Sequence, residues 1–411
     1  MEFVADFHIH SKYSRATSKQ IDPETLDYWA GVKGVKVLGT GDFTHPAWLQ
    51  TLKENLEPAE QGLYRIKGKN TRFILSSEIS CIYSKKGKTR KIHVVVLSPS
   101  FKEAEKINAE LGRIGNLKSD GRPILGLDAK ELVKIVLETS PESFIILAHI
   151  WTPWFSLFGS RSGFDSMEEC FEEYTKHIHA VESGLSSDPL MNWRLSALDK
   201  VALVSNSDAH SPRKIGREAN VFNTDLSYNA IIEVIKSKDP KRFLYTIEFF
   251  PQEGKYHYDG HRNCGVVLSP EEREKYNGIC PVCLKPLTIG VLSRVEELAD
   301  RKEDFKPPGA IPFKSLIPLE EIIKESLGYS SLTKAVEREY QNIIKETGNE
   351  FAALLKADQE ILQKATLPEV AEGIMRARRG EVKAEPGYDG VFGKVRVFSK
   401  KEKESKQKQN T

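Results

Sequence analysis

The sequence is poor in the features that mark secreted, membrane-spanning or strongly charged proteins. Its 411 residues contain only 5 cysteines, too few for the disulfide framework of a secreted chain, so we expect an intracellular, cytoplasmic protein. No uninterrupted apolar run reaches the roughly 18 residues of a membrane span, and the N-terminus lacks the basic and apolar segments of a signal peptide. The net charge is only +2, so evidence for nucleic-acid binding has to be sought in local clusters of charge.

What the chain does contain is an alternation of short β-rich runs and helical segments, which continues to about residue 250. Seven runs follow this pattern: FVADFHI (3–9), VKVLGTG (35–41), FILSSEI (73–79), IHVVVLS (92–98), FIILAHI (144–150), HAVES (179–183) and VALVSNS (201–207). Such alternation is typical of an α/β fold with a mostly parallel sheet, either open or closed into a barrel.

Residues that can bind metal ions stand where these runs end. In the first run His8 and His10 share a face, because alternate side chains of a strand point the same way. The later runs supply Asp42, His45, Glu78, His149, Glu182, Asp208 and His210, while His93 begins its run instead. Any one of these histidines could be a hydrogen-bonded core residue. Because the C-terminal ends of parallel barrel strands converge on one rim, their common placement predicts a metal centre there.

Six motifs, HIH, GDFTH, SSEIS, KIHVVVL, LAHI and NSDAH, resemble in this order the motifs of the polymerase-and-histidinol-phosphatase (PHP) family. The resemblance implies a distorted (β/α)7 barrel that holds two or three divalent metal ions and hydrolyses phosphoesters. It implies a first ion held by His8, His10, Glu78 and Asp208. Glu78 would bridge to a second ion held by His93 and His149, and His210 would serve a third.

Two positions depart from the family pattern. Asp42 stands where many members have a histidine, and a further histidine just after the first motif is missing. We expect Asp42 to be a ligand, and His45 to be a ligand or a proton donor to the leaving oxygen. The residues with implied catalytic roles are therefore Asp42, His45, Asp208 and His210.

The residue types fit hydrolysis by metal-activated water. Clustered carboxylates and imidazoles suit zinc or manganese, and magnesium is a further candidate for activity. A bridging carboxylate sets two ions about 3.5–4 Å apart, which lets them hold both the attacking and the leaving oxygen of a phosphoester. No separate serine or cysteine nucleophile is needed, and no catalytic triad is visible in the sequence.

A second metal signal lies in residues 251–300. His261 and Cys264 stand three apart, as do Cys280 and Cys283. This spacing predicts a tetrahedral Cys3His zinc site. The alternatives are a chance cluster of buried cysteines, or His257 as the fourth ligand. Four protein ligands leave no open position, so the expected role is to fold a module too small to build its own core.

The remaining sequence divides into two parts. Residues 301–395 follow a proline-rich joint and are predominantly helical in pattern, and we expect them to contribute to DNA binding. Residues 396–411 form a basic tail that is predicted to be disordered. Its last segment, KKEKESKQKQNT, has no apolar residue. The final QNT, from Gln409, resembles the start of a peptide that binds the sliding clamp, cut short before its apolar residues.

The substrate is indicated by a second resemblance that extends from residue 1 to about 395. The segments HIWTPWFSLFGSRSGFDS, VESGLSSDPLMNW, SNSDAHSP, GKYHYDGHRNCG and PGYDGVFG resemble the endonuclease Q family of archaea and bacteria. The resemblance implies a DNA-repair endonuclease that cuts the phosphodiester 5′ of uracil, hypoxanthine, xanthine or an abasic site. Candidate substrate contacts are Arg15, Lys85, Lys86, Lys88, Trp151, Gly159, Ser160, Arg161 and Tyr388.

Each substrate contact has a structural alternative. The basic SKKGKTRK segment could be a solvated hairpin tip, RARRG (376–380) could serve the helix dipole, and the Gly-rich and aromatic segments could be turns and core. Two other functions also remain open: a phosphatase for a small phosphomonoester, and a non-catalytic DNA-binding scaffold.

Overall fold

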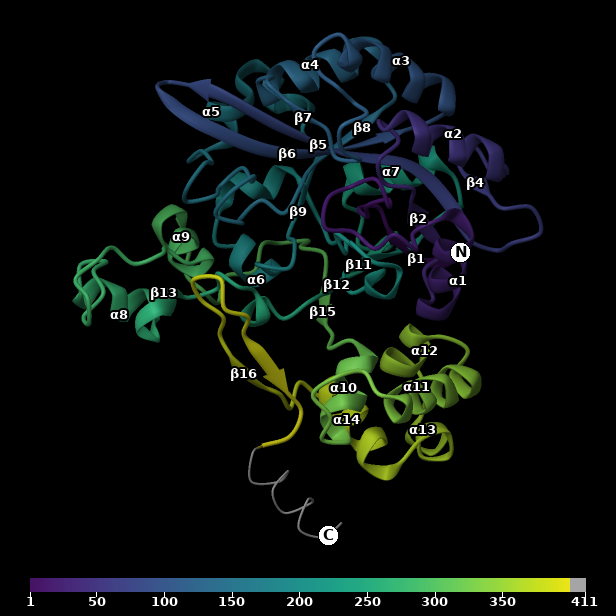
Figure 1. The fold of residues 1–411 in the computed structure, drawn as a ribbon, viewed down its shortest axis with the longest axis vertical. Coiled ribbons are helices and arrows are strands. Elements are labelled where there is room, and N and C mark those ends of the chain that lie inside the picture. Colours follow the sequence, from purple (N-terminus) through teal and green to yellow (C-terminus); the bar gives the residue numbers. More distant parts are fainter. Residues whose placement is uncertain (400–411) are drawn as a thin grey trace.

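A curled, mixed sheet forms the centre of the computed structural model, which describes residues 1–399 (Figure 1). Its strands lie in the order β10 (Ala202–Val204), β9 (Ala180–Glu182), β8 (Phe144–Leu147), β6 (Lys88–Ser98), β5 (Arg72–Lys85), β2 (Val37–Gly39), β1 (Glu2–Asp6), β11 (Ala219–Asn223), β12 (Phe243–Glu248) and β15 (Phe313–Ser315). The short strands β3 (Glu57–Pro58), β4 (Tyr64–Arg65) and β7 (Ile124–Leu125) pair beside this path. The predicted distorted PHP-type barrel is confirmed.

The sheet is less parallel than the sequence suggested. The pairs β5–β6, β6–β8, β1–β11 and β11–β12 are antiparallel. The long β5–β6 hairpin turns at Lys86 and Gly87, both at positive φ (52° and 74°). A two-residue turn of this kind can only join antiparallel strands. The alternation of β-rich and helical segments predicted mostly parallel strands, and a hairpin tip was only the structural alternative for the basic SKKGKTRK segment.

Side-chain amides link β10, at one end of the curled sheet, to β1 and β11. The backbone N–H of Phe7, after β1, donates to Asn206 Oδ1 at 2.9 Å. Asn220, in β11, pairs with both backbone groups of Ser205, accepting from its N–H at 3.0 Å and donating to its carbonyl at 2.7 Å. These amides supply partners between the end of β10 and the strands β1 and β11, with which β10 shares no described ladder, because a buried backbone group needs a partner.

Helices cover the outside of the sheet: α1 (Pro23–Lys33), α2 (Pro46–Asn55), α3 (Phe101–Gly112), α4 (Ala129–Thr139), α5 (Met167–Phe171), α6 (Pro189–Asn192) and α7 (Tyr228–Ser237). In α4, Asp128 caps the N–H of Lys130, and Leu132, Val133 and Val136 are buried. Neighbouring residues of the central strands belong to different apolar clusters, for example Ile74 and Leu75. Both faces of the sheet are therefore buried, which fixes the strand ends rigidly.

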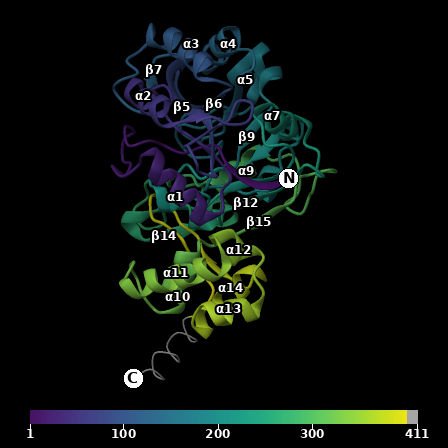
Figure 2. The same cartoon turned by 90° about the vertical axis from the view of Figure 1, so that its right-hand side faces the viewer.

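Beyond residue 250 the chain forms two appended regions (Figures 1 and 2). The first holds the candidate zinc ligands between His261 and Cys283 and is called the zinc module for this reason. It contains β13 (Asp259–His261), β14 (Val266–Leu268), α8 (Pro270–Lys275) and α9 (Val291–Leu298). The helical region contains α10 (Leu319–Ser326), α11 (Lys334–Thr347), α12 (Glu350–Leu355), α13 (Gln359–Ala365) and α14 (Pro368–Arg378). Within residues 1–399, no helix combines the length and the apolar character that crossing a bilayer requires.

Two segments of the predicted region 301–395 lie outside its helices. β15 pairs in parallel with β12 and so belongs to the barrel sheet. The hairpin of β16 (Lys383–Glu385) and β17 (Lys394–Arg396) returns toward the zinc module, where the N–H of Tyr258 donates to Gly387 O at 2.9 Å. The sequence analysis did not predict β15 or the β16–β17 hairpin, because each of these strands is only a few residues long. The predicted tail, 396–411, begins too early, because Arg396 ends β17 and Val397 and Phe398 are buried. Residues 400–411, including Gln409, lie outside the described residues.

Candidate metal centres

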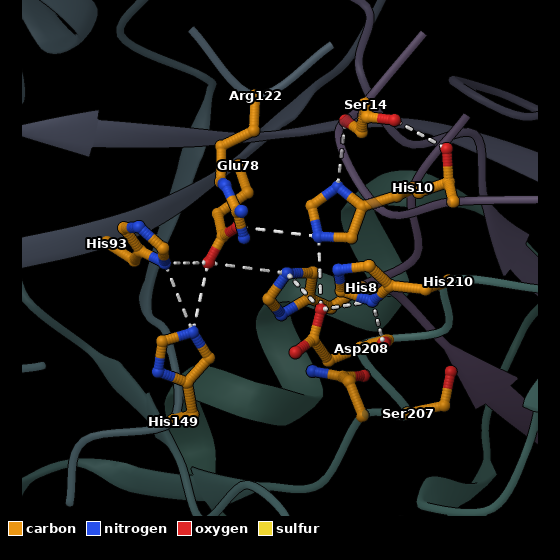
Figure 3. A network of polar contacts seen from close by, with 12 residues as sticks. His8, His10, Ser14, Glu78, His93, Arg122, His149, Ser207, Asp208 and His210 are labelled. Carbon is orange, nitrogen blue, oxygen red and sulfur yellow. Dashed lines mark hydrogen bonds and ion pairs between the residues drawn. The ribbon is translucent and has the colours of Figure 1, made fainter. Parts of the chain in front are cut away.

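Three overlapping groups of potential ligands lie together in the barrel (Figure 3). They are His8, His10 and Glu78; His10, Asp208 and His210; and Glu78, His93 and His149. Within each group the ligand atoms lie within 4.8 Å of one another. Seven side chains that are distant in the sequence thus face one space.

The strand directions explain how they meet. His8 and His10 follow β1, His149 follows β8 and Asp208 follows β10. Glu78 lies inside β5, and His93 in β6 pairs with Ser80 of β5. Because β5 and β6 are antiparallel, the beginning of β6 lies beside the later part of β5. For this reason His93 can begin a run and still reach the same site as residues that end one.

Glu78 lies at the centre and divides its two oxygens between two sets of neighbours. Oε1 lies 2.7 Å from His93 Nδ1 and 3.1 Å from His149 Nε2. Oε2 lies 3.4 Å from His10 Nε2 and 3.0 Å from the guanidinium of Arg122. A buried carboxylate with this division is suited to bridge two ions.

The donor set fits divalent metal ions. Ligands about 2.0–2.1 Å from a tetrahedral zinc ion lie about 3.3 Å from one another, and the facing nitrogens of His93 and His149 are 3.3 Å apart. His8 Nε2 is buried and has no hydrogen-bond partner, although a buried polar atom ordinarily has one. It lies 3.6 Å from Glu78 Oε1 and 3.7 Å from Asp208 Oδ1, so an ion among them would supply the missing partner.

Two carboxylates lie behind the histidines and orient them. Glu182 accepts from His8 Nδ1 at 3.0 Å and from the backbone N–H of His149 at 2.9 Å. Asp42 Oδ1 lies 3.1 Å from His10 Nδ1, and its Oδ2 accepts from the hydroxyls of Ser11 and Ser14 at 2.6 and 2.7 Å. Partners of this kind fix the tautomer and the direction of a ligating imidazole. Asp42 thus occupies an orienting position and lies outside the three ligand groups in which we had expected it.

The electrostatics favour the ionised forms of the acids. Burial raises the pKa of Glu78, but its close contacts with His93, Arg122 and His8 outweigh the burial and hold the pKa well below its usual value. For His10, burial is outweighed by hydrogen bonds to Asp208 and Asp42, which raise its pKa. Burial lowers the pKa of His93 to about 4, so its imidazole is neutral at pH 7, the form that binds a metal.

The backbone at the site is strained at three of these positions. Asp42, His149 and Asp208 have φ values of 48°, 28° and 46°, a region that residues other than glycine seldom occupy. Such conformations persist where the surroundings over-determine them, and they cluster at functional sites.

Arg122 is the residue of the site that the sequence interpretation missed. It lies in a loop before β7, away from the end of any apolar run, so no periodic signal marked it. The preceding Gly121 is packed so closely that a Cβ there would lie 2.2 Å from Asp42 Oδ2. A glycine directly before a basic residue, in the loop between α3 and β7, was the available clue.

His45 and several expected substrate contacts lie outside the metal groups. His45 stacks on Tyr13 with ring centroids 4.2 Å apart. Trp151 is buried and donates to Asn192 at 2.8 Å, so it is part of the core. Gly159 is buried too, whereas Ser160 is half-buried and Arg161 is exposed. Arg15 is exposed and pairs with Asp120 at 3.1 Å.

The basic hairpin lies farther from the site than the sequence suggested. Lys85 is seven residues beyond Glu78 along β5, which corresponds to up to about 23 Å of extended strand. Its ammonium pairs with Glu172 at 2.8 Å and Asp128 at 3.3 Å. Lys86, in the turn, and Lys88, directly after it, carry no such pair within residues 1–399.

The second candidate centre is the cluster of His261, Cys264, Cys280 and Cys283, whose ligand atoms all lie within 4.8 Å of one another. Cys283 Sγ and His261 Nδ1 are 3.3 Å apart. The alternative imidazole, His257, stacks on Tyr258 outside the cluster. Tyr388, expected to contact substrate, lies in the loop that docks on this module and forms a bridge with Tyr258.

Comparison with known proteins agrees with this fold. The family model of the MJ0043 C-terminal domain matches residues 318–381. "Uncharacterized protein MJ0043" of Methanocaldococcus jannaschii is 37% identical over 260 residues, which is 61% of this chain and only 31% of that protein's length. "Uncharacterized protein YqxK" of Bacillus subtilis is 29% identical over 96% of this chain and 99% of its own.

Two solved structures match almost the whole chain. The lesion-specific endonuclease PfuEndoQ from Pyrococcus furiosus has a TM-score of 0.86 at 29% identity, covering 98% of this chain and 99% of its own. Endonuclease Q bound to a 27-mer duplex with an abasic lesion at its active site has a TM-score of 0.85 at 29% identity, covering 97% of each chain. Along almost its whole length the chain therefore shares the fold of endonuclease Q.

Proposed function

We propose that this protein is a metal-dependent DNA-repair endonuclease that hydrolyses the phosphodiester 5′ of a deaminated base or an abasic site. The observation that carries the proposal is the gathering of six metal-capable side chains around Glu78, in a chain that shares the fold of a lesion-specific endonuclease. The duplex bound by endonuclease Q carries an abasic lesion. Uracil, hypoxanthine and xanthine extend the substrate class through the sequence resemblance.

The residues have separable roles in this proposal. Divalent ions at the barrel site would lower the pKa of a bound water and offset charge on the phosphate. His8, His10, Glu78, His93, His149, Asp208 and His210 would hold them. The guanidinium of Arg122, about a quarter exposed beside Glu78, is placed to bind a phosphate oxygen.

The cofactors follow from the ligand types. The Cys3His cluster suits structural zinc, and the histidine and carboxylate groups suit zinc or manganese, with magnesium also able to support activity. A DNA substrate implies work inside the cell. A sliding-clamp contact through the end of the chain remains a proposal, because that segment lies outside the described residues.

The test uses end-labelled duplexes that each carry one uracil, hypoxanthine, xanthine or abasic site, with an undamaged duplex as control. We expect one cut 5′ of each lesion, lost in Asp208→Asn, whose binding to uracil DNA is nearly unchanged. The exposed Asp225→Asn serves as the matched control and retains cleavage. Hydrolysis of p-nitrophenyl phosphate without any cut in lesion DNA would overturn the proposal in favour of a phosphomonoesterase.

A further inference from the structure

The segment from Asp208 to Arg217 connects the barrel metal site with the helical region. Asp208 and His210, at its beginning, belong to one ligand group. The next residues form the single turn η3 (Pro212–Lys214), which packs beside α1. Whatever holds this turn therefore also limits where the two ligands can lie.

The helical region holds the turn through Arg213. Its guanidinium lies 3.2 Å from Glu320 of α10 and 2.8 Å from Glu337 of α11. The same group stacks over the ring of Trp29 in α1, 4.7 Å from the centroid. A planar guanidinium with two carboxylates and an aromatic face has little freedom to reorient, and Lys214 adds a contact to Glu321 at 3.3 Å.

A buried ion pair fixes the helical region against the barrel at the same place. Lys33, at the end of α1, lies 2.5 Å from Glu350 of α12, and both side chains are less than a tenth exposed. Glu350 also accepts from the Tyr340 hydroxyl at 2.6 Å and from the Leu319 N–H at 3.1 Å. A fully partnered buried pair permits one arrangement of the two surfaces and opposes others.

The barrel grips the segment from the opposite side. Arg217 donates to the carbonyls of Ser207 and Asp208 at 2.8 and 3.2 Å. The Gly216 N–H donates to Asp6 at 3.0 Å, and the His210 carbonyl accepts from the Ser18 N–H at 2.9 Å. Both ends of the segment are thus tied, which is what the positive φ of Asp208 requires in order to persist.

The basic end of α14 has a structural use within the helical region. Arg378 donates to the carbonyls of Leu354 and Ala353 at the end of α12, at 2.8 and 2.5 Å. Arg379 pairs with Glu381 at 2.7 Å. Cations that bind the last carbonyls of a helix stabilise it, so these side chains do not by themselves argue for a DNA contact.

We propose that the helical region holds the segment from Asp208 to Arg217 in the conformation that binds metal, a role that we call the brace. In this role Arg213 is a positioning residue that acts through Asp208 and His210. The expected effect of the brace on DNA cleavage rests on the proposed nuclease function, whereas its expected effect on metal affinity does not. The two can therefore fail separately.

The test compares metal affinity in full-length variants. Mn²⁺ is titrated into the protein with its Cys3His cluster loaded with zinc, and free Mn²⁺ is followed by electron paramagnetic resonance. We expect Arg213→Gln to weaken Mn²⁺ binding 10-fold or more, Glu337→Gln to weaken it in the same direction, and Arg213→Lys to restore it in part. Arg338→Gln, on the exposed face of α11, serves as the matched control and binds normally.

Cleavage and exchange supply independent measurements. In Arg213→Gln we expect kcat on lesion DNA to fall with KM nearly unchanged, and hydrogen exchange to rise over residues 207–217. The reversed pair Arg213→Glu with Glu337→Arg should recover Mn²⁺ affinity relative to Arg213→Glu alone. Normal Mn²⁺ affinity in both Arg213→Gln and Glu337→Gln would overturn the brace. A rise in KM alone in Arg213→Gln would overturn it too, because it would assign the helical region to direct DNA contact. Absence of lesion cleavage in the wild type, with the Mn²⁺ effect intact, would overturn only the proposed function.

Discussion

The barrel site and the zinc module use the same kinds of side chain in opposite ways. The barrel's ligands span the chain from His8 to His210 and come together because strands with two buried faces hold them there. The module's ligands lie between His261 and Cys283, around a small cluster of Leu268, Cys280 and Leu287. In the barrel the fold brings the candidate ligands together, whereas in the module we expect a bound metal to stabilise the fold.

Exposure follows the same division. At the barrel site, Asp208 is a quarter exposed and Arg122 similarly so, so a substrate can reach atoms beside the ligands. The module's four candidate ligands would complete a tetrahedral set around zinc and so leave no position for substrate. From this comparison we expect that removal of a ligand abolishes DNA cleavage when the ligand belongs to the barrel, and unfolds the module when the ligand belongs to the module.

The largest expected effect is loss of activity in Glu78→Gln. An amide cannot bridge two cations, so we expect cleavage of lesion DNA to fall at least 1,000-fold, about 4 kcal/mol in the barrier. The barrel strands should keep their hydrogen-exchange protection, since apolar packing and not the metal holds them. Glu138→Gln, on the exposed side of α4, is the matched control. Retention of a tenth of the activity would show that Glu78 is not a bridge.

The second effect is loss of structure in the module while metal binding in the barrel persists. Cys280→Ser removes a ligand, and we expect loss of one zinc ion and fast hydrogen exchange over residues 251–300. The docked loop at 386–393 should exchange faster as well, because Asp389 accepts from the Arg262 N–H and from Thr288, both at 2.7 Å. Mn²⁺ binding at the barrel should persist.

The buried Cys81, outside the cluster, provides the control for that variant. Cys81→Ser should keep its zinc content, whatever it does to core stability. An unaltered exchange pattern and melting curve in Cys280→Ser would mean that the module folds without its metal, and the comparison between the two sites would fail.

The sequence was most informative where chemistry and strand ends coincide. The order of the six motifs anticipated which residues meet around Glu78, and the paired spacing of His261, Cys264, Cys280 and Cys283 anticipated the second cluster. These residues are recognisable because few other roles require such residue types at such positions.

Orienting and long-range contacts could not be read from the sequence. Asp42 has the identity of a ligand, and only its hydrogen bonds to His10 and Ser11 place it behind the site. Lys85 looks like a free cation until Glu172 is found beside it. Arg213 lies near the metal motif in sequence, but its partners in α10 and α11 are more than 100 residues away. Residue type sets what a side chain can do, and packing decides which of those roles it takes.

The third effect tests the layer behind the barrel ligands. Asp42→Asn removes the negative charge beside His10 and keeps the size of the side chain. We expect a 10–100-fold loss in Mn²⁺ affinity and in cleavage. Gly121→Ala should act in the same direction, since its Cβ would press on Asp42 Oδ2. Ordinary Mn²⁺ affinity in both variants would mean that His10 needs no orienting partner.

The fourth effect is a pH dependence of barrel stability. Burial raises the pKa of Glu248 to about 8, from 4.5 for the free side chain. Between these values the folded chain keeps a proton that the unfolded chain releases, so this contribution to stability is fully present below about pH 4.5 and is lost as pH rises through about 8. Zinc binding by the module has the opposite trend, because its ligands must lose protons.

Glu248→Gln keeps a neutral side chain beside Ser183, which now donates to Glu248 Oε2 at 2.8 Å. In this variant the fall of the urea midpoint between pH 5 and 8 should flatten, with zinc held in excess at every pH. Glu142→Gln, outside this buried group, is expected to behave like the wild type. A wild-type slope in Glu248→Gln would place the pH dependence elsewhere.

The smallest effect concerns the surface that neither site uses directly. A duplex can extend well beyond the cut, so Lys86 and Lys88 at the hairpin tip are still expected to reach its phosphates. Their reversal to Glu should lower the slope of log affinity against log salt by up to about 2, with cleavage at saturating DNA unchanged. Reversal of Lys67 and Lys69, which flank Gly68 in a similar exposed turn, is the matched control and should leave the slope as it was. An unchanged slope in the hairpin variant as well would show that DNA does not extend along β5 and β6, and would confine the substrate to the surface around Arg122.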